Sequence, residues 1–450
     1  MDGEINWTAV REEVTGYLRH LVRFDTTNPP GNETPAARYL AGILEGAGFE
    51  VTLLESAPGR GNLIARLEGT GEERPLLLLS HLDVVPAERE EWERDPFGGE
   101  LVDGYIWGRG TVDTKQLTAM ELMVLLLLKR EGFVPRRDII LAATADEEMG
   151  GRYGLGWLLE THPQLLDCEY AINEGGGIGI DFGGRRFYVC QTAEKGVCWL
   201  RVRTRGRAGH ASIPTKDNAV VHLAKALTRL ARAKLPMHRT ATVEAFVRGL
   251  ARGQRFPASL LFPLVLNPLF EPLILKSLPA EGMIGPALRA MLHNTATPTV
   301  LRAGEKTNVI PPTAEAEVDC RMLPGQSVES LLAEVKPILG EEVEVEVFAT
   351  TTPYEGDYHT ELYELFGQVL AELDPGSAVV PFLLTGSSDG RYLAARGVKV
   401  YGFSPMKQEP GLPILELAHG RNERISVENL LFGTRVLYEV VRRFCGLAPP

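Results

Sequence analysis

Hydrophobic positions follow two patterns in the first and last thirds of the chain. From Trp7 to about Phe49 they recur at helical spacing in two blocks, separated by a turn-rich cluster at residues 26–32, which predicts two helices around a loop. Short apolar runs follow that do not alternate with polar residues, as strands covered by helices on both faces require. We predict such strands at 51–54, 63–67, 76–79, 139–143, 170–172 and 398–403, with helices at 116–129, 153–160, 362–373 and 428–444. Strands alternating with helices predict an α/β fold with a mostly parallel sheet.

The middle of the chain has a different pattern. Its elements occur in the order β-α-β-β-α-β, the split motif of ferredoxin-like domains, with strands at 197–205, 300–303, 316–321 and 343–348 and helices at 218–233 and 328–339. We therefore predict an α+β domain at 196–350, inserted into a larger domain formed by 1–195 and 351–450. An extra stretch, 235–297, is apolar but interrupted by prolines, which favours a cap or a subunit contact.

The composition agrees with two folded domains, and the net charge disfavours nucleic acid as a partner. The chain has 450 residues, of which 44% are hydrophobic and 24% charged, as in soluble globular proteins. The net charge of -12, without a basic stripe, makes nucleic acid an unsuitable partner.

The sequence indicates neither secretion nor a membrane-spanning segment. The N-terminal residues lack a signal-peptide pattern, and the five cysteines have no regular spacing, so we predict a cytoplasmic protein with reduced thiols. The most apolar stretch, 257–270, contains three prolines and is shorter than the roughly 20 residues that span a bilayer. We therefore expect no membrane partner.

Acidic residues and histidines follow the predicted strands. His81 and Asp83 come directly after the run at 76–79, the acids 146–148 follow the run at 139–143, and Glu174 follows the run at 170–172. In open α/β sheets, ligands bind beyond the carboxyl ends of the strands, so we expect these side chains to converge there.

Imidazole nitrogens and carboxylate oxygens are ligands that zinc accepts, and many acids with few histidines favour a pair of metals bridged by a carboxylate. Asp113, in a glycine-rich loop, is a candidate bridge, and His419, just before the last helix, is a further candidate ligand. Each fragment has an ordinary alternative. A His-x-Asp is usually surface or core decoration, three acids can complement a helix dipole, and Asp113 can be a turn residue. Their common position at strand ends favours a site.

In these residues the chain resembles the di-zinc hydrolases that include aminoacylase, carboxypeptidase G and succinyl-diaminopimelate desuccinylase. The matching segments cover nearly the whole chain: 27–31, 81–86, 108–113, 146–148, 173–175, 194–196, 209–212, 308–311, 319–321, 386–389 and 419–423. The resemblance implies a zinc-exopeptidase-like catalytic domain with a ferredoxin-like lid.

The resemblance also assigns roles to individual residues. It implies two zinc ions per chain, for which cobalt or manganese could substitute, with the carboxylate of Asp113 as the bridge. His81 and Glu174 would complete one metal's protein ligands, and Glu148 and His419 the other's. Asp83 would orient His81 by accepting its second ring N–H. Glu147 would be the general base.

On the lid, the resemblance implies a homodimer in which His210 stabilises the oxyanion in the partner's site. Asn308, Arg321, Gly386 and Ser387 would bind the substrate carboxylate. Without the resemblance, His210 would be taken as a loop histidine and Arg321 as a solvated side chain or the partner of Asp319.

We therefore expect a metal-dependent hydrolase that cleaves an amide beside a free carboxylate. A carboxypeptidase or dipeptidase acting on small peptides is our first hypothesis, and an N-acyl-amino-acid amidohydrolase is the alternative. Glu at position 174 favours acylated amino acids, whereas the segment 294–299 resembles carboxypeptidases, so the two indications disagree. A non-catalytic binding protein is disfavoured because base and ligands are all present, and a phosphatase because no phosphate cradle follows the first strand.

Overall fold

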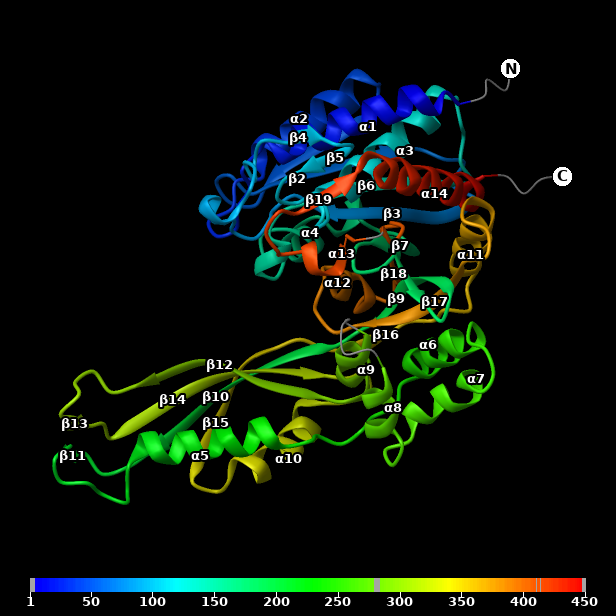
Figure 1. Ribbon diagram of the computed structural model, residues 1–450. Helices are drawn as coiled ribbons and strands as arrows, with labels where there is room; N and C mark the ends of the chain where they lie inside the picture. Colours follow the sequence, from blue (N-terminus) through cyan, green and yellow to red (C-terminus); the bar gives the residue numbers. More distant parts are fainter. Residues whose placement is uncertain (1–4, 279–283, 410, 413, 447–450) are drawn as a thin grey trace. The chain divides into compact units, whose positions relative to one another are not determined.

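The computed structural model describes residues 5–278, 284–409, 411–412 and 414–446 (Figure 1). The chain forms two compact units. The first consists of Met1–Thr192, Gly356–Pro381 and Ser388–Pro450, and the second of Ala193–Glu355 and Phe382–Ser387. Our predicted insertion at 196–350 falls within the second unit, which also includes 193–195 from the predicted first part and 351–355 and 382–387 from the predicted C-terminal part.

The first unit is built on a mixed sheet whose centre is parallel. In spatial order its strands are β1 (Glu50–Glu55), β2 (Gly61–Leu67), β6 (Arg137–Thr144), β3 (Glu73–His81), β7 (Tyr170–Asn173), β18 (Lys399–Gly402) and β9 (Arg185–Glu194). The β6–β3, β3–β7 and β7–β18 pairs are parallel, and the outer pairs are antiparallel. β8 (Ile178–Phe182) and β17 (Ala378–Leu384) also pair with β9.

Helices cover both faces of this sheet, which explains the unbroken apolar runs. On one face, Leu76 and Leu78 join a core with α1 (Trp7–Val22), α2 (Thr34–Gly46), α3 (Lys115–Arg130), α11 (Glu361–Leu373) and α14 (Val427–Cys445). On the other face, Leu77 and Leu79 pack with residues of α4 (Leu155–Thr161) and α12 (Gly390–Ala394). Because successive side chains of a strand point to opposite faces, both sets must be apolar. The predicted α/β fold class is confirmed.

The register of the central strands brings their carboxyl ends to one edge. Leu77 lies opposite both Ile140 and Ala171, and His81 lies opposite Thr144. A small sheet of β4 (Glu100–Val102), β5 (Tyr105–Trp107) and β19 (Arg424–Ser426) joins the segment before Asp113 to the segment after His419, which follows α13 (Ile414–Leu417).

The second unit contains the predicted β-α-β-β-α-β motif. Its elements are β10 (Gly196–Arg205), α5 (Ala219–Arg232), β12 (Thr295–Ala303), β14 (Thr313–Met322), α10 (Val328–Leu339) and β15 (Val343–Thr350). The strands form an antiparallel sheet in the order β12-β14-β10-β15, and α5 and α10 pack on it around an apolar core. A short pair, β11 (Gly209–His210) and β13 (Val309–Ile310), joins two of the connections, and β16 (Tyr354–Glu355) pairs with the end of β9.

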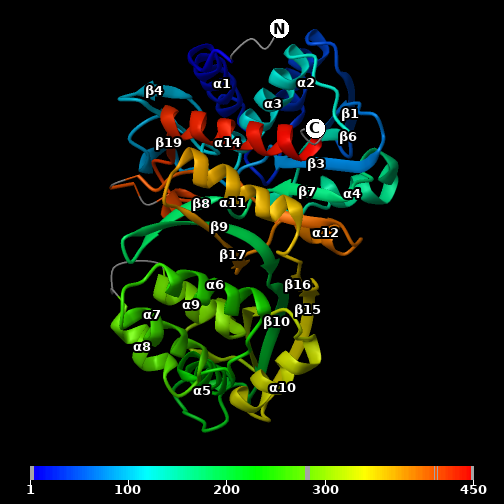
Figure 2. The same cartoon turned by 90° about the vertical axis from the view of Figure 1, so that its right-hand side faces the viewer.

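The extra stretch of the second unit is helical. It contains α6 (Ala241–Arg252), α7 (Ala258–Leu261), the 3-10 helix η4 (Phe262–Leu266), α8 (Glu271–Ser277) and α9 (Ile284–Leu292), which are grouped together in Figure 2. Within the residues that the structure describes, none of the helices combines the length and the apolar character that crossing a bilayer requires.

Candidate active site

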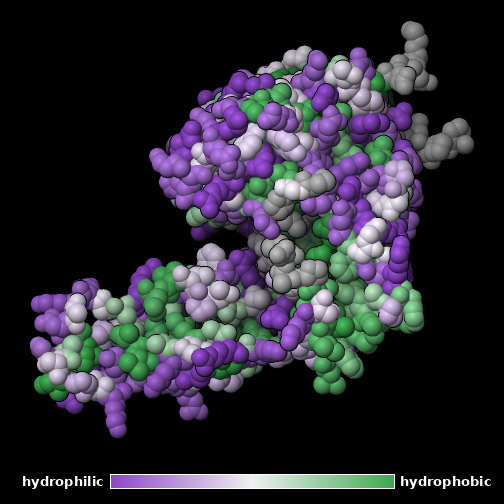
Figure 3. All heavy atoms as spheres, in the orientation of Figure 1, coloured by the Kyte–Doolittle hydropathy of each residue, from purple (hydrophilic) through white to green (hydrophobic). Residues whose placement is uncertain are grey.

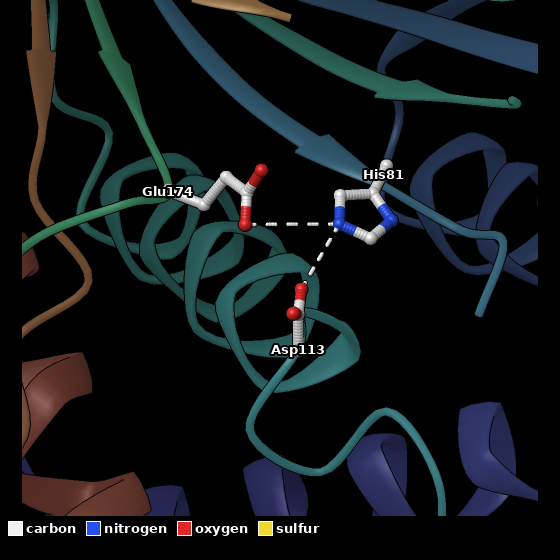
Figure 4. A group of neighbouring side chains, drawn as sticks. All are labelled: His81, Asp113 and Glu174. Atoms are coloured by element: carbon white, nitrogen blue, oxygen red, sulfur yellow. Dashed lines mark hydrogen bonds and ion pairs between the residues drawn. The ribbon is translucent and has the colours of Figure 1, made fainter. Parts of the chain in front are cut away.

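His81 stands at the carboxyl end of β3 with its ring fixed on both sides. Its Nδ1 lies 2.9 Å from the carbonyl oxygen of Asp83 and 3.5 Å from the Asp83 carboxylate. Its Nε2 faces Asp113 Oδ1 at 3.3 Å and Glu174 Oε2 at 3.7 Å (Figure 4). The ring is almost entirely buried, so it is presented to these acids in one orientation.

The second carboxylate oxygen of Asp113 faces a second group of ligand atoms. His419 Nε2 lies 3.1 Å from Asp113 Oδ2 and 3.1 Å from Glu148 Oε2. Within each of two groups, His81–Asp113–Glu174 and Asp113–Glu148–His419, the potential ligand atoms lie within 4.8 Å of one another. The side chain of His419 is 55% exposed and that of His81 only 2%, so one group is open to solvent and the other is enclosed.

Glu147 lies beside the enclosed group, with Oε2 3.9 Å from His81 Nε2. Its position follows from the carboxylate of Asp83, which accepts hydrogen bonds from the backbone N–H of Glu147 at 3.0 Å and of Glu148 at 3.1 Å. Asp83 therefore holds both His81 and the turn that carries the two glutamates.

A buried polar network supports this turn from behind; its members Asn28 and Asp146 lie in segments that the sequence indicated, whereas Arg60 and Glu33 do not. Asn28 Nδ2 donates to both Asp83 Oδ2 at 2.8 Å and Asp146 Oδ1 at 3.1 Å. Arg60 donates to the same Asp146 oxygen at 2.8 Å and to Glu33 at 2.9 Å. Asp146 itself has a left-handed backbone (φ 71°), which is uncommon outside glycine, and these contacts hold it there.

Glu423 holds the loop that carries Asp113 in place through hydrogen bonds to its backbone. Its buried carboxylate accepts from the backbone N–H groups of Gly110, Val112 and Asp113 at 3.1, 2.6 and 3.0 Å. Arg109 pairs with it at 2.7 Å and also donates to the carbonyl of His419. Glu423 lies in one of the motifs that carried the family resemblance, but its contacts depend on the fold and could not be predicted.

The concentration of acids perturbs their protonation. Burial, together with the neighbouring Asp113, raises the pKa of Glu174 to about 7. Burial and the charge of Glu174 raise the pKa of Glu147 well above its usual value. Hydrogen bonds that its ring N–H donates to the carboxylates of Asp113 and Glu148 raise the pKa of His419 to about 10. So many buried carboxylates repel one another and favour any cation among them.

The donor set fits divalent metal ions. Each group offers one imidazole nitrogen and two carboxylates, and the two oxygens of Asp113 point to different histidines, as a bridging carboxylate requires. Outer contacts that fix ligand orientation are present for His81 and for Asp113.

The other predicted site residues belong to the second unit. His210 is exposed, with Nδ1 2.7 Å from Ser212 Oγ. Arg321 forms a two-bond pair with Asp319 at 2.7 and 2.9 Å, the alternative that its position at a strand end allowed. Ser387 Oγ donates to Glu194 at 3.0 Å, Gly386 precedes it, and the backbone carbonyl of Asn308 accepts from Ala211 at 3.0 Å.

A sheet with a parallel centre, beside which two groups of acids and histidines share one carboxylate, is the arrangement of a metal-dependent hydrolase. The chain belongs to the peptidase family M20/M25/M40, whose sequence model matches residues 77–443. The predicted family and the prediction of a hydrolytic enzyme are thereby confirmed.

Individual relatives agree with this membership. The chain is 32% identical over 379 residues to the human N-fatty-acyl-amino acid synthase/hydrolase PM20D1, covering 82% of this chain and 74% of the relative. It is 26% identical over 433 residues to aminoacylase-1 of Sus scrofa, covering 94% and 93%. The fold is similar to that of an M20 family metallo-carboxypeptidase, Sso-CP2 from Sulfolobus solfataricus, with a TM-score of 0.71 at 19% identity over 96% of this chain and 98% of that one.

Proposed function

We propose that this chain is a di-zinc amidohydrolase that cleaves an amide bond beside a free carboxylate. The observation that supports it most directly is that two three-residue groups of ligand atoms share Asp113 and lie next to Glu147. His81 and Glu174 would hold one metal, Glu148 and His419 the other, and Asp113 both.

Zinc ions bound there would polarise the scissile carbonyl and lower the pKa of water toward about 7. Glu147 would take the proton of the attacking water and return it to the departing amine, because its carboxylate lies at the edge of the ligand cluster. The backbone hydrogen bonds to Asp83 keep this carboxylate in place through both transfers.

Binding of the substrate carboxylate is assigned to Arg321, with Asn308, Gly386 and Ser387. Arg321 donates two parallel hydrogen bonds to the Asp319 carboxylate. A guanidinium binds a substrate carboxylate with the same two-bond geometry. We further propose a cytoplasmic homodimer, formed through the lid, in which the exposed imidazole of His210 stabilises the oxyanion in the partner's site.

Two substrate classes share the required carboxylate: small peptides with a free C-terminus, and N-acyl amino acids. The second class has specific support, because a relative at 32% identity is an N-fatty-acyl-amino acid synthase/hydrolase. Peptides are supported by the matching peptidase family model, by a relative at 28% identity named as a probable carboxypeptidase, and by the similar fold of a metallo-carboxypeptidase.

The test is a hydrolysis panel in which dipeptides and N-acyl amino acids share the same C-terminal residue. Metal content is measured in the same preparation by mass spectrometry. We expect two zinc equivalents, loss of activity with a chelator and recovery on adding zinc. Turnover of only one class identifies the substrate, whereas a metal-loaded protein inactive on both classes would overturn the proposal.

A further inference from the structure

The helical stretch of the second unit exposes a group of large apolar side chains that the proposed reaction does not use. We call this group the apolar shelf; it consists of Phe256, Leu260, Leu261, Leu269, Phe270 and Leu273. Leu269 is 85% exposed, Phe256 80% and Leu260 68%. Of the seventeen large apolar side chains exposed in the described part of the chain, these six fall between positions 256 and 273.

The shelf is a formed surface. Other apolar residues of the same stretch are buried: Phe262, Val265 and Leu266 of η4 and Leu275 of α8. Helices α6, α7 and α8 all pack against η4, so the inward residues fix the positions of the outward ones. Figure 3 shows hydrophobic surface over α7 and α8. Contiguous exposed apolar surface of this kind usually marks a contact with a protein or a membrane.

The charges beside the shelf are positive in a protein whose net charge is -12. Arg255 directly precedes Phe256, Arg252 ends α6, and Lys276 lies three residues after Leu273 on α8. All three are exposed, and none has an ion-pair partner among the residues that the structure describes. The only acid in the sequence from 245 to 278 is Glu271, which is mostly buried and accepts from His293 Nε2 at 3.0 Å.

We propose that the apolar shelf docks on a lipid surface that carries anionic headgroups. The leucines and phenylalanines would enter the boundary between headgroups and acyl chains, and Arg252, Arg255 and Lys276 would contact the phosphates. Because the chain is acidic overall, an anionic surface repels most of it and attracts this face, which orients the protein. Such docking needs no spanning segment, but it departs from the expectation of no membrane partner, which rested on the lack of such a segment.

The same charges disfavour a second copy as the occupant. A two-fold contact through the shelf would bring the three cations of each copy into one interface, without an exposed acid between 245 and 278 to offset them. The inference does not depend on the proposed hydrolase activity.

The test is co-sedimentation of the full chain with phosphatidylcholine vesicles that contain or lack phosphatidylglycerol. We expect binding to the anionic vesicles, weakening as salt is raised, and little binding to the neutral ones. Leu260→Ser should weaken partitioning about tenfold, from the loss of one leucine buried in the bilayer. Arg255→Gln should weaken it about fivefold, as expected for one cation near the surface.

Matched controls come from the same unit. Leu301→Ser removes a side chain that is 66% exposed on β12, and Lys306→Gln removes an exposed cation away from the shelf. Both should bind vesicles as the parent does. The proposal is overturned if the parent does not sediment with anionic vesicles, or if the shelf variants and the controls lose binding equally. It is also overturned if sedimentation velocity shows a dimer that Leu260→Ser dissociates while vesicle binding is unchanged.

Discussion

The first unit buries charge, whereas the second exposes apolar surface. In the first, His81 and Asp83 lie at the end of β3 and Glu174 follows β7, while Asp113 lies in the loop before α3. In the second, Phe256 and Leu269 extend into solvent from a stretch that buries other apolar residues such as Val265. Both arrangements are unfavourable for an isolated fold, by desolvation in one unit and by exposed hydrocarbon in the other.

The two units tolerate these costs by different means. The buried acids are held by several hydrogen bonds each, as Asp83 is by two backbone N–H groups and Asn28. The exposed apolar residues lie on short helices and their connections, whose inward residues pack on η4. Function in the first unit should therefore be sensitive to distant polar contacts, and function in the second to the exposed atoms themselves.

The largest effect is expected at Glu147. Glu147→Gln keeps the shape of the side chain but removes the base, so kcat should fall by about 10³-fold or more. Metal content should be unchanged, because the five proposed ligands remain. Steady-state kinetics and mass spectrometry of the same sample check both expectations. A variant with full metal content and an unchanged rate would remove Glu147 from the mechanism.

A smaller effect is expected from Asn28, which touches no proposed ligand of the metals. Asn28→Ala removes a donor shared by Asp83 and Asp146, and leaves two buried carboxylates without it. We expect metal affinity or kcat to fall about 10- to 100-fold, as for other residues that orient ligands, with KM little changed.

The matched control is Asn294→Ala in the second unit. Asn294 is equally buried, donates to Glu334 at 3.1 Å and accepts from Leu323 N–H at 2.9 Å. Both variants should lose thermal stability, but metal titration should change only for Asn28→Ala. Equal changes in both variants would mean that Asn28 acts on stability alone.

A third prediction concerns the metal-free protein and pH. Burial raises the pKa of Glu174, Asp389 and Glu33 to about 7 each. An acid whose folded pKa is raised favours folding below its unfolded pKa, and this contribution is lost as pH rises through the folded pKa. The chelated protein should therefore lose stability as pH rises from about 4.5 to above 7.

Metal should reverse this loss, since binding stabilises the folded state by about 4 kcal/mol at a thousandfold excess over Kd. Melting temperatures of the chelated and zinc-loaded protein across this pH range provide the measurement. A chelated protein that becomes more stable over the same range would contradict the assigned pKa directions.

The fold and the site were predictable to different extents. The strands around Leu77, Ile140 and Ala171 were predicted because strands buried on both faces leave unbroken apolar runs. The strands β8, β9 and β17 were not predicted, and β12 begins at Thr295, five residues before its predicted start. Arg185–Glu194 begins with two arginines and carries polar residues that only its neighbours in the sheet bury.

For the site, strand ends and motifs indicated the seven residues of the first unit that the structure brings together. Arg60 and Glu33 were not indicated, because nothing in the sequence links either to Asp146. Their pairing arises from the fold, which places the loop before β2 behind the acidic turn.

The smallest effect is expected when a residue of the apolar shelf is replaced and the free energy of unfolding is measured. Leu260→Ser alters a side chain that is 68% exposed, so the free energy of unfolding should change by less than about 0.5 kcal/mol. Leu250→Ala, in the same helical stretch but fully buried, should cost about 2–5 kcal/mol. Denaturant unfolding of both variants measures the contrast. If Leu260→Ser costs as much as Leu250→Ala, its side chain is packed in solution, and the difference between a unit that buries charge and one that exposes apolar surface no longer holds.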